Sequence, residues 1–123
     1  MARHNNTYLC LCRAGCQYRD IGFLVDGSGS IVEDVIDTYA LMQEFIKRII
    51  GRIDVGPRQN LVGVVQFSST VETIFNFNTF ANSSKAEIYK EIDDMLALYD
   101  NTNTALGLRS LFTGIFNNWC TTR

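Results

Sequence analysis

The stretch Asp20-Ile21-Gly22-Phe23-Leu24-Val25-Asp26-Gly27-Ser28-Gly29-Ser30 decides how the rest of the chain is interpreted. Its apolar run predicts a strand buried in a sheet, and the glycines and serines that follow predict a loop. In open α/β sheets, ligands collect at the carboxyl ends of the strands. Asp26, Ser28 and Ser30 alternate with glycines, so a tight loop can direct one carboxylate and two hydroxyls to one point. Such hard oxygen donors suit Mg²⁺, Mn²⁺ or Ca²⁺.

The same loop departs from four other motifs that combine glycine with acidic or hydroxyl residues. It has no lysine for a phosphate-binding P-loop, and Val32 stands where a dinucleotide fingerprint needs its third glycine. A nucleophile elbow needs glycines two residues before and two residues after its serine, and Ser28 has Asp26 and Ser30 there. An EF-hand starting at Asp26 would need glycine where Ile31 stands. The alternative is a turn that only caps the next helix, with Ser30 as N-cap and Glu33 completing a capping box. That capping role is compatible with metal binding.

Outward from this loop, the apolar pattern alternates between strand and helix periods. It predicts a helix from Ser30 to near Gly51, a buried strand at Leu61–Phe67, and a hairpin-paired strand nearer the edge at Val71–Phe77. A second helix should begin at Ser84, with Ile88, Ile92, Met95 and Leu96 on its apolar face, and a loop should follow at Tyr99–Asn103. The apolar face of the last helix should consist of Leu108, Leu111, Phe112, Ile115 and Phe116. The order predicts an α/β fold, a Rossmann-like open and mainly parallel sheet with helices on both faces. With about three strands and three helices, we expect this fold to be incomplete.

Composition indicates one folded domain and narrows the function classes. The chain has 123 residues, of which 46% are hydrophobic and 20% charged, and its net charge of -2 argues against a nucleic-acid partner. No apolar run approaches the roughly 20 residues of a membrane span. His4 is the single histidine, which argues against histidine-based catalysis. We divide the chain into a cysteine-containing segment, 1–19, and a domain, 20–123.

The cysteines and sequons bear on the cellular compartment. The four cysteines are Cys10, Cys12, Cys16 and Cys120, a spacing poorly suited to zinc. They allow three disulfide connectivities if the chain is extracellular, and a Cys16–Cys120 bond would join the two ends of the domain. N-glycosylation sequons at Asn5 and Asn82 favour secretion, although the first 20 residues contain no recognisable signal peptide.

Three separated motifs resemble the von Willebrand factor A family, which includes the integrin I domains. D-I-G-F-L-V-D-G-S-G-S-I is similar to the family's opening strand and metal-ion-dependent adhesion site, whose D-x-S-x-S pattern matches Asp26, Ser28 and Ser30. Ile53–Phe67 is similar to the second strand, especially in collagen and integrin members, and Asn101–Leu108 resembles the loop that supplies a threonine to the metal. By this resemblance Thr102 is the fourth metal-site residue, and the match covers about residues 20–118.

The resemblance implies a secreted or extracellular binding module rather than an enzyme. A divalent cation (Mg²⁺, or Mn²⁺ or Ca²⁺) held by the four residues would take a glutamate or aspartate from a matrix or cell-surface protein. Two alternatives remain open at this point. One is an intracellular scaffold domain in a multiprotein complex, which the lack of a visible signal peptide favours. The other is a fragment that keeps the loop but binds no metal.

The sequence departs from the family pattern in two places. Members continue into an apolar strand ending in T-D-G, whose aspartate is the fifth metal-site residue, and nothing after Asn118 matches it. We therefore expect a C-terminally truncated domain with weakened cation affinity and an uncovered, aggregation-prone sheet edge. In addition, Asp100-Asn101 stands where members often have glycines before the threonine.

Overall fold

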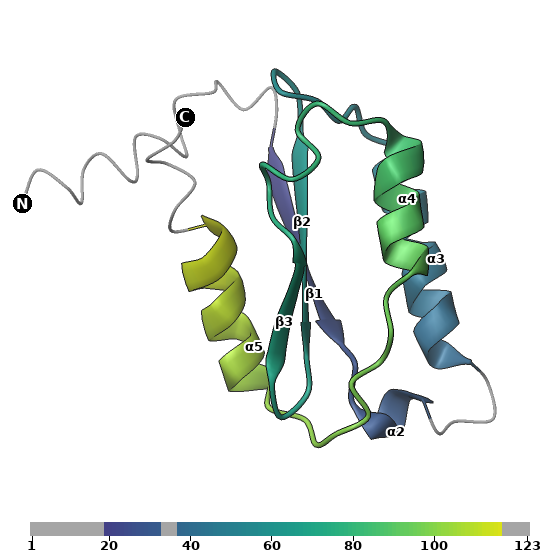
Figure 1. Ribbon diagram of the computed structural model, residues 1–123, viewed down its shortest axis with the longest axis vertical. Helices are drawn as coiled ribbons and strands as arrows, with labels where there is room; N and C mark the ends of the chain where they lie inside the picture. Colours follow the sequence, from purple (N-terminus) through teal and green to yellow (C-terminus); the bar gives the residue numbers. More distant parts are fainter. Residues whose placement is uncertain (1–18, 33–36, 117–123) are drawn as a thin grey trace, which may run out of the picture.

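A computed structural model describes residues 19–32 and 37–116, which form three layers (Figure 1). A three-stranded sheet lies in the middle, with α3 (Thr38–Gly51) and α4 (Lys85–Asp93) on one side. The helix α5 (Thr104–Ser110) lies on the other side, continued by the π-helical turn η1 (Leu111–Phe116). The predicted α/β architecture, with helices on both faces of the sheet, is confirmed. Within the described ranges, no helix is long and apolar enough to cross a membrane.

The sheet contains β1 (Asp20–Asp26), β2 (Leu61–Phe67) and β3 (Val71–Phe75), in that order. The strands β1 and β2 are parallel, so the carboxyl ends of both lie at one edge, whereas β2 and β3 form an antiparallel hairpin with a register shift between Val64 and Val65. Every residue of β2 is buried. A strand covered on both faces needs apolar residues at successive positions, and the run L-V-G-V-V-Q-F provides them with one polar exception.

The predicted single helix from Ser30 to Gly51 is two helices. Ser30 lies inside the short α2 (Gly29–Val32) and does not cap the long helix, which begins at Thr38. The Asp37 carboxylate accepts a hydrogen bond from the Ala40 backbone N–H at 3.0 Å, which satisfies one of the free donors in the first turn of α3. The prediction failed because the helical period continues through this second capping residue. The predicted end at Gly51 is confirmed.

The helix α4 starts where the sequence predicts, because Ser84 N–H donates to the Glu87 carboxylate at 2.8 Å. It ends at Asp93, so Met95 and Leu96 lie in the following segment. Met95 is buried, but Leu96 is 81% exposed and is not the helical core residue that its spacing predicts.

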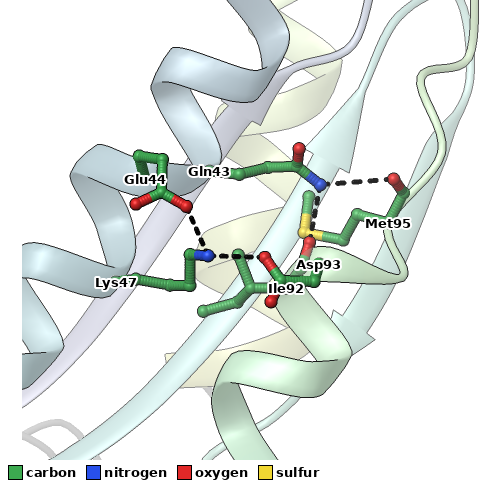
Figure 2. A network of polar contacts seen from close by, with 6 residues as sticks. All are labelled: Gln43, Glu44, Lys47, Ile92, Asp93 and Met95. Carbon is green, nitrogen blue, oxygen red and sulfur yellow. Dashed lines mark hydrogen bonds and ion pairs between the residues drawn. The ribbon is translucent and has the colours of Figure 1, made fainter.

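Side chains of α3 hold the end of α4 in place (Figure 2). The Gln43 amide donates to the carbonyl oxygens of Ile92 and Met95, at 2.7 and 3.4 Å. Lys47 forms ion pairs with Glu44 of its own helix and with Asp93 of α4, at 2.5 and 2.6 Å. Hydrogen bonds to these two carboxylates raise the pKa of Lys47.

Two apolar clusters pack against the two faces of the sheet. The cluster under α3 and α4 centres on buried residues from β1, β2, β3 and both helices: Val25, Ile46, Ile50, Val62, Val64, Phe75, Ile88 and Ile92. The cluster under η1 contains Leu61, Val65, Phe77 and Ile115, with Leu111 and Phe116 packed against it. Leu108 and Phe112, predicted as part of the apolar face of the last helix, are instead 55% and 67% exposed.

Candidate metal centre

The candidate site begins where β1 ends, beside the end of β2. Asp26 is opposite Phe67 in the parallel register, and Gly27 N–H extends the pairing by donating to the Phe67 carbonyl at 2.8 Å. Gly27 is required by space, since a Cβ on it would lie 2.8 Å from Cδ of the buried Gln66. This close approach places the loop that follows directly over the end of the sheet.

The three residues of the D-x-S-x-S pattern come together in this loop. The Asp26 carboxylate accepts a hydrogen bond from Ser28 N–H at 2.9 Å, and the hydroxyl oxygens of Ser28 and Ser30 lie 3.2 Å apart. Ser28 is 1% exposed, whereas Ser30, in α2, is exposed. Two oxygens at right angles around Mg²⁺ lie about 2.9 Å apart, and around Ca²⁺ about 3.4 Å. The spacing of the two hydroxyls therefore fits two positions on one such cation.

The segment that carries Thr102 is tied to both strand ends. Figure 1 shows the chain leaving α4 and passing α2 at this end of the sheet before it enters α5. The Asp100 carbonyl accepts from Gly29 N–H at 3.0 Å, and Asn103 N–H donates to the Ser68 carbonyl at 2.8 Å. Thr102 is exposed and lies between these two anchored residues. The structure thus brings the Thr102 loop to the loop of Asp26, Ser28 and Ser30.

Few carboxylates lie at this edge of the sheet, so most of the candidate donors are hydroxyl oxygens and the site has little negative charge. Asp26 is the one carboxylate in the D-x-S-x-S loop, and the Asp100 carboxylate is exposed and accepts from Asn101 N–H at 2.8 Å. Across residues 19–32 and 37–116, no three His, Cys, Asp or Glu side chains gather in a way that could hold a metal. Any cation here would depend on the Asp26 carboxylate and on serine and threonine oxygens, which are hard donors that suit a hard cation.

A buried polar layer, which the sequence alone does not predict, lies beneath the loops. Gln66 is fully buried; its amide donates to the Leu96 carbonyl at 2.8 Å and its side-chain oxygen accepts from the Tyr39 hydroxyl. Burial raises the pKa of Tyr39 to about 12, with smaller contributions from the charges of Glu72 and Tyr99. One signal was available: glutamine is the polar exception in an apolar strand. Such a residue is expected to be hydrogen-bonded.

The other predicted positions lie away from this edge or outside the described residues. Asn82 is exposed, in the turn that precedes α4, so its sequon is accessible. Cys16, Cys120 and Asn5 lie outside the residues that the structure describes.

Comparison with known proteins identifies relatives of this chain. The von Willebrand factor type A domain model matches residues 20–118. The collagen alpha-5(VI) chain of Mus musculus is 41% identical over 92 residues, which is 73% of this chain and 3% of that protein. Matrilin-2 of Mus musculus is 32% identical over 111 residues, covering 87% of this chain and 11% of that protein.

A solved structure shares the fold. Proximal thread matrix protein 1 from the mussel byssus, with a zinc-occupied MIDAS motif, superposes with a TM-score of 0.75 at 31% identity. The match covers 80% of this chain and 25% of that one. The chain spans a small part of the length of each of these relatives. The match over residues 20–118, together with the fold, shows that the chain belongs to the von Willebrand factor type A domain family.

Proposed function

We propose that this domain binds a divalent cation through Asp26, Ser28, Ser30 and Thr102 and uses it to bind an acidic side chain of an extracellular protein. The observation that carries the proposal is the pair of Ser28 and Ser30 hydroxyls, 3.2 Å apart beside the Asp26 carboxylate. The related byssus protein has a metal in its MIDAS motif, which supports a divalent cation here. Mg²⁺ is the cation that we propose first.

The low negative charge of the four proposed ligands favours an acidic partner. One carboxylate and three hydroxyls leave a divalent cation with a net positive charge at the surface. Mg²⁺ holds several waters that an incoming ligand can replace. A glutamate or aspartate from a partner would supply both an oxygen and the missing negative charge. We propose binding rather than catalysis because the loop offers no second carboxylate or lysine as an acid or base.

The relatives support an extracellular setting. Collagen VI chains, matrilins and a thread matrix protein all contain regions similar to this chain. We propose that the chain acts in or at the extracellular matrix, with a matrix or cell-surface protein as its partner.

Cation binding is tested by thermal unfolding in a titration with MgCl₂ and MnCl₂. The midpoint of the wild-type chain should rise as the cation concentration passes Kd, because the cation binds the folded state. Asp26→Ala and Ser28→Ala should abolish the rise. Asp54→Ala, which removes an exposed carboxylate from the turn before β2, is the matched control and should respond like the wild type. A rise of equal size in Asp26→Ala would refute the site.

Adhesion is tested separately, against a panel of immobilised collagens and matrilins in Mg²⁺ and in EDTA. Binding should require Mg²⁺ and should be lost in Ser28→Ala while Asp54→Ala binds normally. Binding that persists in EDTA would assign recognition to another surface of the domain.

A further inference from the structure

Ser68 is the residue directly after β2, at the same edge of the sheet as the candidate metal centre. Its side chain is 0% exposed, and its hydroxyl oxygen has no hydrogen-bond partner among the described residues. Nearly all buried hydroxyls in proteins are hydrogen-bonded to protein or water. An unpartnered buried hydroxyl is therefore an observation that calls for a ligand.

The backbone of Ser68 links the two loops that carry the proposed cation ligands. Its carbonyl accepts from Asn103 N–H, the neighbour of Thr102, and its N–H donates to the Thr70 carbonyl, both at 2.8 Å. The preceding carbonyl, of Phe67, accepts from Gly27 N–H, the neighbour of Ser28, also at 2.8 Å. Because both backbone groups of Ser68 are used, its hydroxyl is the one polar group of this residue left for a ligand.

We propose that the Ser68 hydroxyl belongs to the cation site and hydrogen-bonds a water molecule of the cation's hydration shell. The inference rests on the function proposed above. Mg²⁺ keeps several of its waters when it binds to protein, and these waters need acceptors or donors around them. Partners of this outer kind typically change metal affinity 10- to 100-fold. A buried hydroxyl would contribute most in a site with so little charge of its own.

The test compares Mg²⁺ affinity and cation-free stability in the same variants of the full 123-residue chain. Ser68→Ala should raise the Kd for Mg²⁺ about tenfold, measured by calorimetry and by the shift of the thermal midpoint. It should not lower the midpoint in EDTA, because no hydrogen bond between described residues is lost. Ser68→Cys, which keeps a side chain of similar size but is a weak hydrogen-bonding group, should show the same loss of affinity. Ser69→Ala removes the neighbouring hydroxyl as the matched control and should bind like the wild type.

The outcomes separate this inference from the function on which it rests. If Ser68→Ala and Ser68→Cys bind Mg²⁺ as tightly as the wild type while Asp26→Ala does not, the cation site stands and the role of Ser68 is overturned. A lower midpoint in EDTA with unchanged Mg²⁺ affinity would overturn it as well, because the hydroxyl would then serve packing alone. If the wild-type chain does not respond to Mg²⁺, the proposed function fails and this inference fails with it.

Discussion

Gln66 links three parts of the chain beside the proposed cation site. Its side chain accepts from Tyr39 of α3, donates to the Leu96 carbonyl and lies against Gly27. The net contribution of such a buried hydrogen bond to folding stability is modest. Breaking it costs more, because a buried amide or phenol without its partner cannot be hydrated instead. The loop of Asp26, Ser28 and Ser30 therefore lies on buried polar groups that are hydrogen-bonded to one another.

The buried Tyr39 hydroxyl predicts a loss of stability at high pH. The pKa of Tyr39 is about 12 in the folded state and 10.0 in the unfolded chain. The stabilisation by its neutral hydroxyl is complete below pH 10 and is lost as the pH rises toward 12, because the unfolded chain ionises first. The free energy of unfolding should fall by about 2 kcal/mol over this range.

Urea denaturation at several pH values between 9 and about 11.5 measures this slope. Tyr39→Phe cannot ionise, so its free energy of unfolding should depend less on pH even though it is less stable at pH 7. Parallel pH profiles for the two proteins would contradict the assignment.

Tyr99 is held in a backbone conformation that tyrosine rarely adopts. Its φ of 60° is in the left-handed region, its side chain is 65% exposed, and its N–H donates to the Gly27 carbonyl at 3.0 Å. Tyr99→Gly should raise the free energy of unfolding by about 0.5–1 kcal/mol, because relief of the steric cost exceeds the extra chain entropy of glycine. Equilibrium urea unfolding measures the change. Tyr99→Ala is the control: it keeps the steric cost and should not be more stable than the wild type.

At the scale of elements, the approach of α5 to the sheet depends on one glycine. A Cβ on Gly107 would lie 2.7 Å from Cγ of the buried Phe67 ring, so helix and strand would have to separate. Gly107→Ala should lower the free energy of unfolding by about 1–3 kcal/mol through overpacking.

A second glycine in the adjoining η1 provides a matched control. A Cβ on Gly114 meets nothing within 4 Å, so Gly114→Ala should be neutral or slightly stabilising. Both variants are measured by urea unfolding. Equal effects at the two positions would show that backbone entropy, and not the contact with Phe67, determines the result.

The sequence predicted the elements whose signals are local and continuous. Leu61–Phe67 has the predicted bounds because a strand buried on both faces reads as an unbroken apolar run. The start of α4 is also local, since Ser84 and Glu87 are three residues apart. The break before α3 was missed because apolar spacing continues across it. The exposure of Leu108 and Phe112 was missed because it depends on how the last helix is rotated against the sheet.

For the candidate site too, the sequence predicts the residues that lie in one loop but not those brought together by the fold. Asp26, Ser28 and Ser30 lie within five residues, so their proximity is a property of one loop. Thr102 is far away in sequence, and only the family resemblance indicated that its loop reaches this edge. Gln66 and Ser68 were missed because their importance comes from burial by segments remote in the chain.

At the scale of the whole molecule, β2 is central to both apolar clusters. Its residues Val62 and Val64 face α3 and α4, while Leu61 and Val65 pack with Phe77 and Ile115 on the other side. The strands β1 and β3 flank it, and exposed apolar pairs remain on α3 (Leu41 and Phe45) and on α5 with η1 (Leu108 and Phe112). Both apolar clusters therefore pack against the same central strand, so destabilising substitutions in β2 should disrupt both clusters together.

The Gly27 carbonyl accepts hydrogen bonds from both Leu98 N–H and Tyr99 N–H, and this joins segments that are far apart in the sequence. Because such distant contacts carry a large loop-closure cost, we expect the two loops of the proposed cation site to come together late in folding. Stabilisation of contacts that form after the transition state slows unfolding without speeding folding. In stopped-flow urea jumps, Mg²⁺ should lower the unfolding rate constant of the wild-type chain and leave its folding rate constant nearly unchanged. In Asp26→Ala, Mg²⁺ should change neither rate constant. A bound cation would then lengthen the lifetime of the folded domain and so slow its cleavage by proteases, which act on unfolded chains.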